Sequence, residues 1–169
     1  MGTSAIRVLI VEDYEPFRRF VVSILQQQPE LQVICELSDG IAAVRKAQEL
    51  QPDLVLLDIG LPMLNGIEAA RQICDLCPRS AILFVSQENS SDIVQGALAT
   101  GAKGYVIKTD AGSELLVAVN AVLRGERFLS CSLASGDFSD SKTAYPANHP
   151  ERQKLAALRP RNVAIRPRS

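Results

Sequence analysis

The amino-acid sequence predicts an α/β fold in which helices cover both faces of a doubly wound parallel sheet. First, short and continuously apolar runs recur along residues 1–130, as expected for strands that are buried on both faces. Second, longer segments with apolar residues at helical spacing separate these runs. Third, Gly, Pro and polar residues mark the ends of most segments. Because 47% of the 169 residues are hydrophobic, the chain is long and apolar enough for one domain with a core of its own.

The first half of this domain contains two expected strand and helix pairs. They are, in order, a strand at 6–11, a helix from Pro16 to about Gln27, a strand at 31–37, and a helix that Asp39 opens and that ends before Pro52. Pro16 suits the first turn of a helix, where a missing N–H costs nothing. Pro29 and Pro52 follow the two helices, as expected for a residue that cannot continue a helix.

The second half repeats the pattern three times. We expect strands at 54–58, 81–86 and 104–107, a turn-rich loop at 60–66, and helices that end near Cys77, Gly101 and Gly125. The polar stretch 87–92 is expected to cap the second of these helices, and Asp110 the third. Five such units in about 125 residues predict a flavodoxin-like (βα)5 three-layer sandwich with the sheet order 2-1-3-4-5.

The last part of the chain has a different composition. Residues 130–150 are rich in Ser, Gly, Asp, Thr, Asn and Pro, as in a linker, and only residues 151–158 could form about two helical turns. Residues 131–169 carry seven Lys and Arg against three Asp and Glu. We therefore expect a domain at 5–129 and an irregular, basic and largely disordered tail at 130–169.

The chain shows no sign of membrane insertion or export. No run of about 18 apolar residues occurs, and no secretory signal is visible at the N-terminus. We expect a cytoplasmic protein with no membrane partner.

Polar residues with complementary chemistry follow four of the expected strands. They are Glu12 and Asp13 after the first strand, Asp58 at the end of the third, Ser86 at the end of the fourth and Lys108 after the fifth. Parallel strands end at one edge of a sheet, where ligands bind. Three carboxylates at one place repel each other unless a cation compensates, and Mg²⁺ is a cation that carboxylates, water and phosphate oxygens bind. The pattern predicts a site for Mg²⁺ and a phosphoryl group, with Asp58 as an expected nucleophile.

Other classes of site fit the sequence poorly. Residues 96–103 lack the spacing of a nucleotide-binding P-loop, Glu12 and Asp13 occupy the turn where a dinucleotide site needs glycines, and His149 is the only histidine. The four cysteines lack partners for a structural zinc site. We expect them to be free, with Cys35 and Cys74 as apolar packing residues, Cys77 exposed at a helix end and Cys131 outside the core.

Over residues 5–129 the chain resembles the receiver domains of bacterial two-component response regulators. The matching segments are Val-Leu-Ile-Val-Glu12-Asp13, Leu-Val-Leu-Leu-Asp58-Ile-Gly-Leu-Pro62, Phe-Val-Ser86 and Gly104-Tyr105-Val-Ile-Lys108. The sequences of residues 58–66 and 108–112 are similar to those of the subgroup whose receivers precede a LuxR-type helix-turn-helix.

The resemblance implies that Asp58 accepts a phosphoryl group from a histidine kinase or a phosphotransfer protein. It further implies that Asp13, Asp58 and the carbonyl of Gly60 hold Mg²⁺, with Glu12 contributing through water. Lys108 would pair with the phosphoryl group, and Ser86 and Tyr105 would be the switch residues. The protein would then not be an enzyme beyond promoting its own phosphorylation and dephosphorylation.

Two positions depart from the pattern of the family, and other functions stay open. Gln87 replaces a small residue, and Thr109 stands where many receivers have proline.

One alternative function is a DNA-binding regulator of the LuxR type, with its output domain lost or supplied by the basic tail. Residues 131–169 are too short and too polar for a helix-turn-helix, so we expect no specific DNA binding. A second alternative is an aspartyl phosphatase, which generally has an acid two residues after its nucleophile, where this chain has Gly60. The downstream protein partner is unassigned, and a homodimer stays open.

Overall fold

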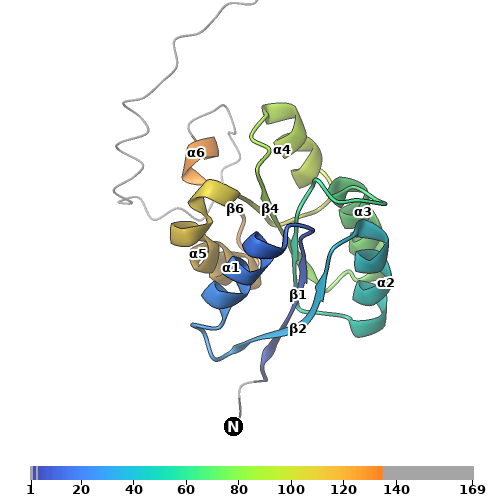
Figure 1. The fold of residues 1–169 in the computed structure, drawn as a ribbon, viewed down its shortest axis with the longest axis vertical. Helices are drawn as coiled ribbons and strands as arrows, with labels where there is room; N and C mark the ends of the chain where they lie inside the picture. The colour runs from blue at the N-terminus through green and yellow to red at the C-terminus, as the bar shows by residue number, and fades with distance from the viewer. Residues whose placement is uncertain (1, 3, 135–169) are drawn as a thin grey trace, which may run out of the picture.

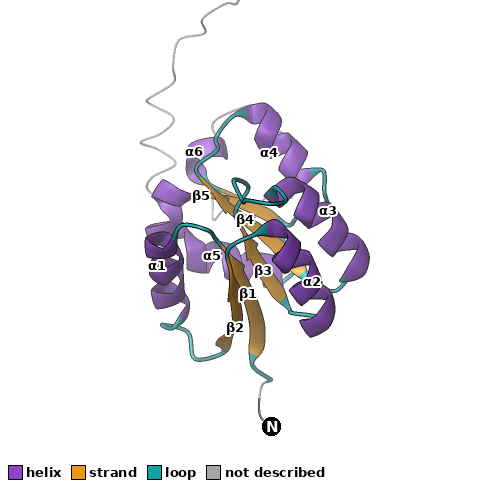
Figure 2. Ribbon diagram, turned by 45° about the vertical axis from the view of Figure 1, so that its right-hand side comes forward, coloured by secondary structure: helices purple, strands orange, loops and turns teal. Residues whose placement is uncertain are grey.

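The structure, a computed structural model, describes residue 2 and residues 4–134, so most of the expected tail lies outside the described residues. Its centre is one parallel sheet of six strands in the order β2-β1-β3-β4-β5-β6 (Figures 1 and 2). The strands are β1 (Ile6–Val11), β2 (Leu31–Leu37), β3 (Leu54–Leu57), β4 (Ala81–Ser86), β5 (Gly104–Ile107) and β6 (Phe128–Leu129). The helices are α1 (Glu15–Leu25), α2 (Gly40–Leu50), α3 (Gly66–Leu76), α4 (Ser91–Leu98), α5 (Ala111–Leu123) and the four-residue α6 (Cys131–Ala134), with a short 3₁₀ turn at Lys108–Asp110.

Helices cover both faces of the sheet, which explains why the central strands are apolar at nearly every position. Successive residues of a strand point to opposite faces. Leu9 and Val11 of β1 belong to the core beneath α2, α3 and α4, whereas Val8 and Ile10 belong to the core beneath α1 and α5. Figure 2 shows α1 and α5 on one side of the sheet and α2 and α3 on the other. The predicted flavodoxin-like sandwich and the order of its first five strands are confirmed.

The sheet contains one strand more than predicted. Phe128 and Leu129 pair with Gly104 and Tyr105 as a sixth parallel strand, and helix α6 follows directly. The expectation that regular structure stops at about Ser130 is therefore wrong for residues 131–134. The expectation that Cys131 lies outside the core is wrong as well, because Cys131 is buried.

Other local expectations hold in part. Pro16 lies in the first turn of α1, and the side chain of Asp39 accepts a hydrogen bond from the Ala42 amide and caps α2, as predicted. Asp110, however, belongs to the 3₁₀ turn before α5 and makes no side-chain cap. The fourth helix starts after Ser90, within the predicted polar stretch, again without a side-chain cap.

The cysteine predictions also had mixed outcomes. All four cysteines are free, as expected. Cys77, which we expected to be exposed, is completely buried, and burial raises the pKa of its thiol.

Two glycines allow close packing around the loop that follows β3. A Cβ atom on Gly66 would lie 1.9 Å from the carbonyl oxygen of Asp58, and one on Gly40 would lie 1.9 Å from that of Leu64. Any other residue at either position would push the loop away from the sheet. The two glycines therefore fix where Asp58 lies.

Within the described residues, no helix is long and apolar enough to cross a membrane.

Candidate functional site

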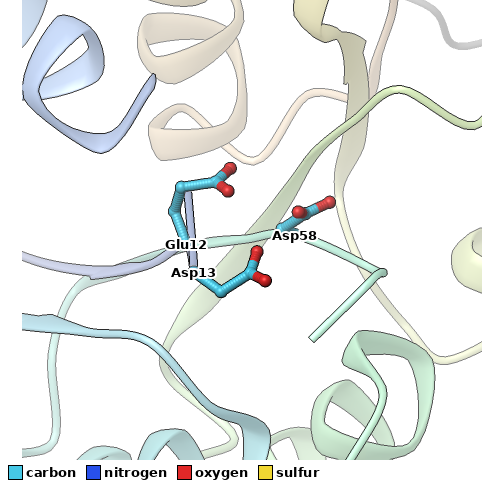
Figure 3. A group of neighbouring side chains, drawn as sticks. All are labelled: Glu12, Asp13 and Asp58. Carbon is cyan, nitrogen blue, oxygen red and sulfur yellow. The ribbon is translucent and has the colours of Figure 1, made fainter. Parts of the chain in front are cut away.

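The predicted site residues meet at one edge of the sheet. Glu12 and Asp13 directly follow β1, Asp58 follows β3, Ser86 is the last residue of β4 and Lys108 follows β5. Because β1, β3, β4 and β5 are adjacent and parallel, their carboxyl ends lie side by side. Figure 3 shows the carboxyl groups of Glu12, Asp13 and Asp58 close together at this edge.

A pocket of about 380 Å³ opens at this edge. It is lined by Asp13, Tyr14, Asp58, Gly60, Ser86, Gln87, Glu88 and Lys108. From the sequence, Tyr14 was assigned no role, Gln87 was noted only as a departure from the family pattern, and Glu88 only as part of the polar stretch 87–92. Tyr14 follows the end of β1 by three positions, and Gln87 and Glu88 follow the end of β4 by one and two positions. This location just after a strand end is the signal that could have identified them.

Lys108 joins two of the carboxylates. Its Nζ atom lies 2.6 Å from Oε2 of Glu12 and 3.0 Å from Oδ2 of Asp58. Burial lowers the pKa of Lys108, but the hydrogen bonds to Glu12 and Asp58 outweigh this effect and hold the pKa above its ordinary value. The ring of Phe17 on α1 lies 4.8 Å from Nζ, a cation–π distance. Phe17 was not singled out from the sequence.

The two buried acids, Glu12 and Asp58, each accept a hydrogen bond from a nearby backbone amide. Glu12 accepts a hydrogen bond from the Tyr14 amide at 3.0 Å, and Asp58 accepts one from the Ile59 amide at 2.7 Å. Burial raises the pKa of Glu12, and its hydrogen bonds to Lys108 and Tyr14 oppose this rise. Both carboxylates are thus held in place by donors around them.

Asp13 is exposed, and its carboxylate makes no hydrogen bond or ion pair with any described residue. Ligand oxygens of Glu12, Asp13 and Asp58 all lie within 4.8 Å of one another, close enough to hold one metal ion. Hard carboxylate oxygens beside an open pocket suit Mg²⁺, which usually keeps several waters. The residues present therefore fit Mg²⁺. Gly60, which we expect to contribute a carbonyl, lines the same pocket.

Ser86 and Tyr105 meet at the start of the loop between β4 and α4. The hydroxyl oxygen of Ser86 accepts a hydrogen bond from the Glu88 amide at 3.2 Å. The hydroxyl of Tyr105 donates one to the Glu88 carbonyl at 2.7 Å. The Tyr105 ring is completely buried beside Phe84, and burial raises the pKa of Tyr105 to about 12. Ser86 and Tyr105 thus bind the amide and the carbonyl group of the same residue, Glu88, and together hold this short loop.

Comparisons with known proteins agree with this geometry. Residues 8–120 match the family described as the response regulator receiver domain. Over 129 residues, 76% of the chain, the sequence is 36% identical to the transcriptional regulatory protein LiaR of Bacillus subtilis (strain 168) and covers 61% of that protein. It is 34% identical to the transcriptional regulatory protein DegU of Brevibacillus brevis over 76% of the chain and 55% of that protein.

A solved structure has the same fold. It is a two-component response regulator of the LuxR family from Aurantimonas sp. SI85-9A1, which superposes with a TM-score of 0.74 at 33% identity over 78% of this chain and 94% of that one. The chain therefore spans between about half and two thirds of the length of these two curated relatives, but nearly all of this solved chain.

Proposed function

Because this chain belongs to the response regulator receiver domain family, we propose that it takes a phosphoryl group from a histidine kinase or a phosphotransfer protein onto Asp58. The observation that carries this proposal is the position of the Asp58 carboxylate, which lines the pocket, lies 3.0 Å from the Lys108 ammonium and is grouped with the carboxylates of Glu12 and Asp13. An oxygen of Asp58 attacks the phosphorus atom, an O–P bond forms, and the P–N bond to the donor histidine breaks. The product is an aspartyl phosphate.

Asp13, Asp58 and the carbonyl of Gly60 would hold Mg²⁺, and Glu12 would contribute through water. Mg²⁺ held there would supply positive charge that compensates the negative phosphoryl oxygens beside the carboxylates. Lys108 adds a second positive charge beside Asp58, and after transfer its ammonium can donate to a phosphoryl oxygen. The protein promotes this transfer and the later hydrolysis of its own aspartyl phosphate only, so we do not assign it an enzymatic substrate.

Phosphorylation would change the loop after β4. The Ser86 hydroxyl, which now accepts from the Glu88 amide, can donate its proton to a new phosphoryl oxygen. Such a movement of residues 86–88 would change the hydrogen bond between Glu88 and Tyr105. Ser86 and Tyr105 are therefore the proposed switch residues, and the surface formed by β4, α4 and β5 is the proposed output surface.

The relatives leave the output of the whole protein open. LiaR and DegU are both named transcriptional regulatory proteins, and this chain covers 61% and 55% of them. We propose that residues 1–169 act as a phosphorylation-controlled interaction module in the cytoplasm and provide no sequence-specific DNA binding. The alternative, in which the basic tail makes this chain a DNA-binding regulator, predicts tight binding to a particular promoter.

The direct test is incubation with acetyl phosphate and Mg²⁺, followed by mass spectrometry of the intact and digested protein. We expect one phosphoryl group on the peptide that contains Asp58. Asp58→Asn should remove it, because the amide is a poor nucleophile. Stable phosphate at the same level on Asp58→Asn would disprove the assignment.

A further inference from the structure

Arg18, near the start of α1, connects the helix to two neighbouring strand ends. Its Nη1 atom donates to the carbonyl oxygen of Glu12 at 2.7 Å, and its Nε atom pairs with Oε2 of Glu36 on β2 at 3.2 Å. The Arg18 side chain is 20% exposed. A planar guanidinium with donors in a fixed fork suits this double contact, because both acceptors are held at once.

The carbonyl that Arg18 binds belongs to the peptide group that joins Glu12 to Asp13. A peptide group is planar and rigid, so an acceptor bond on its oxygen also orients the N–H and the Cα atom of the next residue. Asp13 depends on this effect more than Glu12 does. The Glu12 carboxylate has Lys108 and the Tyr14 amide as partners, whereas the Asp13 carboxylate has none among the described residues.

We infer that Arg18 is a positioning residue, which aims the Asp13 carboxylate at the Mg²⁺ site by holding the Glu12–Asp13 peptide. The inference rests on the proposed function, since it takes Asp13 to be a metal ligand. Arg18 itself does not line the pocket. Its effect passes through one hydrogen bond to the backbone, as partners behind a metal ligand commonly orient that ligand.

The sign of the effect on Mg²⁺ affinity separates this role from simple electrostatics. Arg18 carries a positive charge near a cation site, so Coulomb repulsion alone predicts that its removal strengthens Mg²⁺ binding. Loss of positioning predicts the opposite, since a ligand that is no longer aimed must be ordered when the metal binds. If Arg18 only attached α1 to the sheet, its removal would change the free energy of unfolding but leave the Mg²⁺ affinity of the folded protein unchanged.

The experiment measures Mg²⁺ binding to the full 169-residue chain by calorimetry, with circular dichroism to verify folding. We expect Arg18→Gln to raise the Mg²⁺ dissociation constant about tenfold. Arg19→Gln is the matched control, because Arg19 is the neighbouring arginine on α1, is 77% exposed and forms an ion pair with Glu15 alone among the described residues. It removes the same charge without touching the Glu12 carbonyl, and we expect it to leave the affinity unchanged or slightly higher.

Arg18→Lys keeps the charge but lacks the fork, so it should give an intermediate loss. If Arg18→Gln fails to fold, the Mg²⁺ dissociation constant of Arg18→Lys tests the inference in its place, with Arg19→Lys as its control. An unchanged or lower dissociation constant in the folded Arg18 variants would overturn the inference.

A second readout is the dependence of the phosphorylation rate on Mg²⁺, with acetyl phosphate as donor. The Arg18→Gln chain should need about ten times more Mg²⁺ to reach half of its maximal rate, and its maximal rate should match that of the wild type. A defect that persists at saturating Mg²⁺ would overturn the positioning role. If the wild-type chain itself bound no Mg²⁺, the proposed function would fail and this inference with it. If the wild type bound Mg²⁺ and Arg18→Gln bound it equally well, only the inference would fail.

Discussion

The Nζ atom of Lys108 lies 3.0 Å from Oδ2 of Asp58, and this ion pair links β5 to β3 across β4. The same ammonium lies 2.6 Å from Glu12, so one cation compensates two buried carboxylates. An uncompensated acid pair in a half-closed site is destabilising, because the two charges repel each other and have little water around them.

We predict that Lys108→Ala lowers the free energy of unfolding by about 1–3 kcal/mol. Added Mg²⁺ should recover part of this loss, since a bound cation replaces the missing charge and stabilises the folded state by mass action. Urea denaturation with and without Mg²⁺ measures both effects. Lys46→Ala is the control, because Lys46 pairs with Glu49 on the surface of α2 and should contribute about 0.5 kcal/mol or less. Equal losses in the two variants, or no recovery with Mg²⁺, would contradict this role of Lys108.

Asp13 and Glu12 should differ in their contributions to Mg²⁺ binding. Asp13→Ala removes a carboxylate with no other partner among the described residues, and we expect about a tenfold or larger loss of affinity. Glu12→Gln should cost less, because we expect Glu12 to act through water and to be occupied by Lys108. Asp75→Ala, an exposed acid at the far end of α3, serves as the control for loss of charge alone. The ligand assignment is wrong if calorimetry finds the same affinity for the wild type and Asp13→Ala.

Beryllofluoride, which imitates a phosphoryl group on Asp58, should move the loop that Ser86 and Tyr105 hold. We expect chemical shift changes at residues 86–90 and at Tyr105, and none of similar size in β2, which is remote from this loop. Ser86→Ala should abolish the loop changes while Asp58 still binds beryllofluoride, because the hydroxyl donor is missing. Spectra in which residues 86–105 are unaffected by beryllofluoride in the wild type would exclude the switch.

The sheet and the edge of the site could be predicted because each depends on local signals. A continuous apolar run indicates a doubly covered strand, and the residue that follows it lies at a known edge. The sixth strand could not be predicted, since Phe128 and Leu129 are too few to show any periodicity. The roles of Phe17 and Arg18 also depend on partners from other elements, Lys108 and Glu36, which no spacing on α1 reveals.

Ser130, which directly follows β6, is joined to β5 and α5 by buried polar contacts. The Ser130 hydroxyl donates to Oε2 of Glu114 at 2.6 Å and accepts from the Ile107 amide at 2.9 Å. Ser130→Ala leaves both groups buried without this partner, and we expect a loss of about 1–3 kcal/mol in the free energy of unfolding. Ser113→Ala, an exposed serine on α5, should cost about 0.5 kcal/mol or less. Similar denaturation midpoints for the two variants would show that the buried contact contributes little.

The last prediction concerns DNA. Specific recognition requires an element that lies in a groove with several side chains at base edges. The described helices α1 to α5 pack on the sheet, and the sequence after residue 134 contains Pro160 and Pro167 within its most basic part. Seven basic residues in 131–169 can contact phosphates, but such contacts carry no sequence information.

We therefore expect fluorescence anisotropy to show weak DNA binding, with a dissociation constant of about 10⁻⁶ M or higher near physiological salt. Binding should fall steeply as salt rises, and a promoter fragment and its scrambled version should bind equally, with and without beryllofluoride. Tight binding to one promoter over its scrambled control would instead establish the alternative, a DNA-binding regulator whose output lies within these 169 residues.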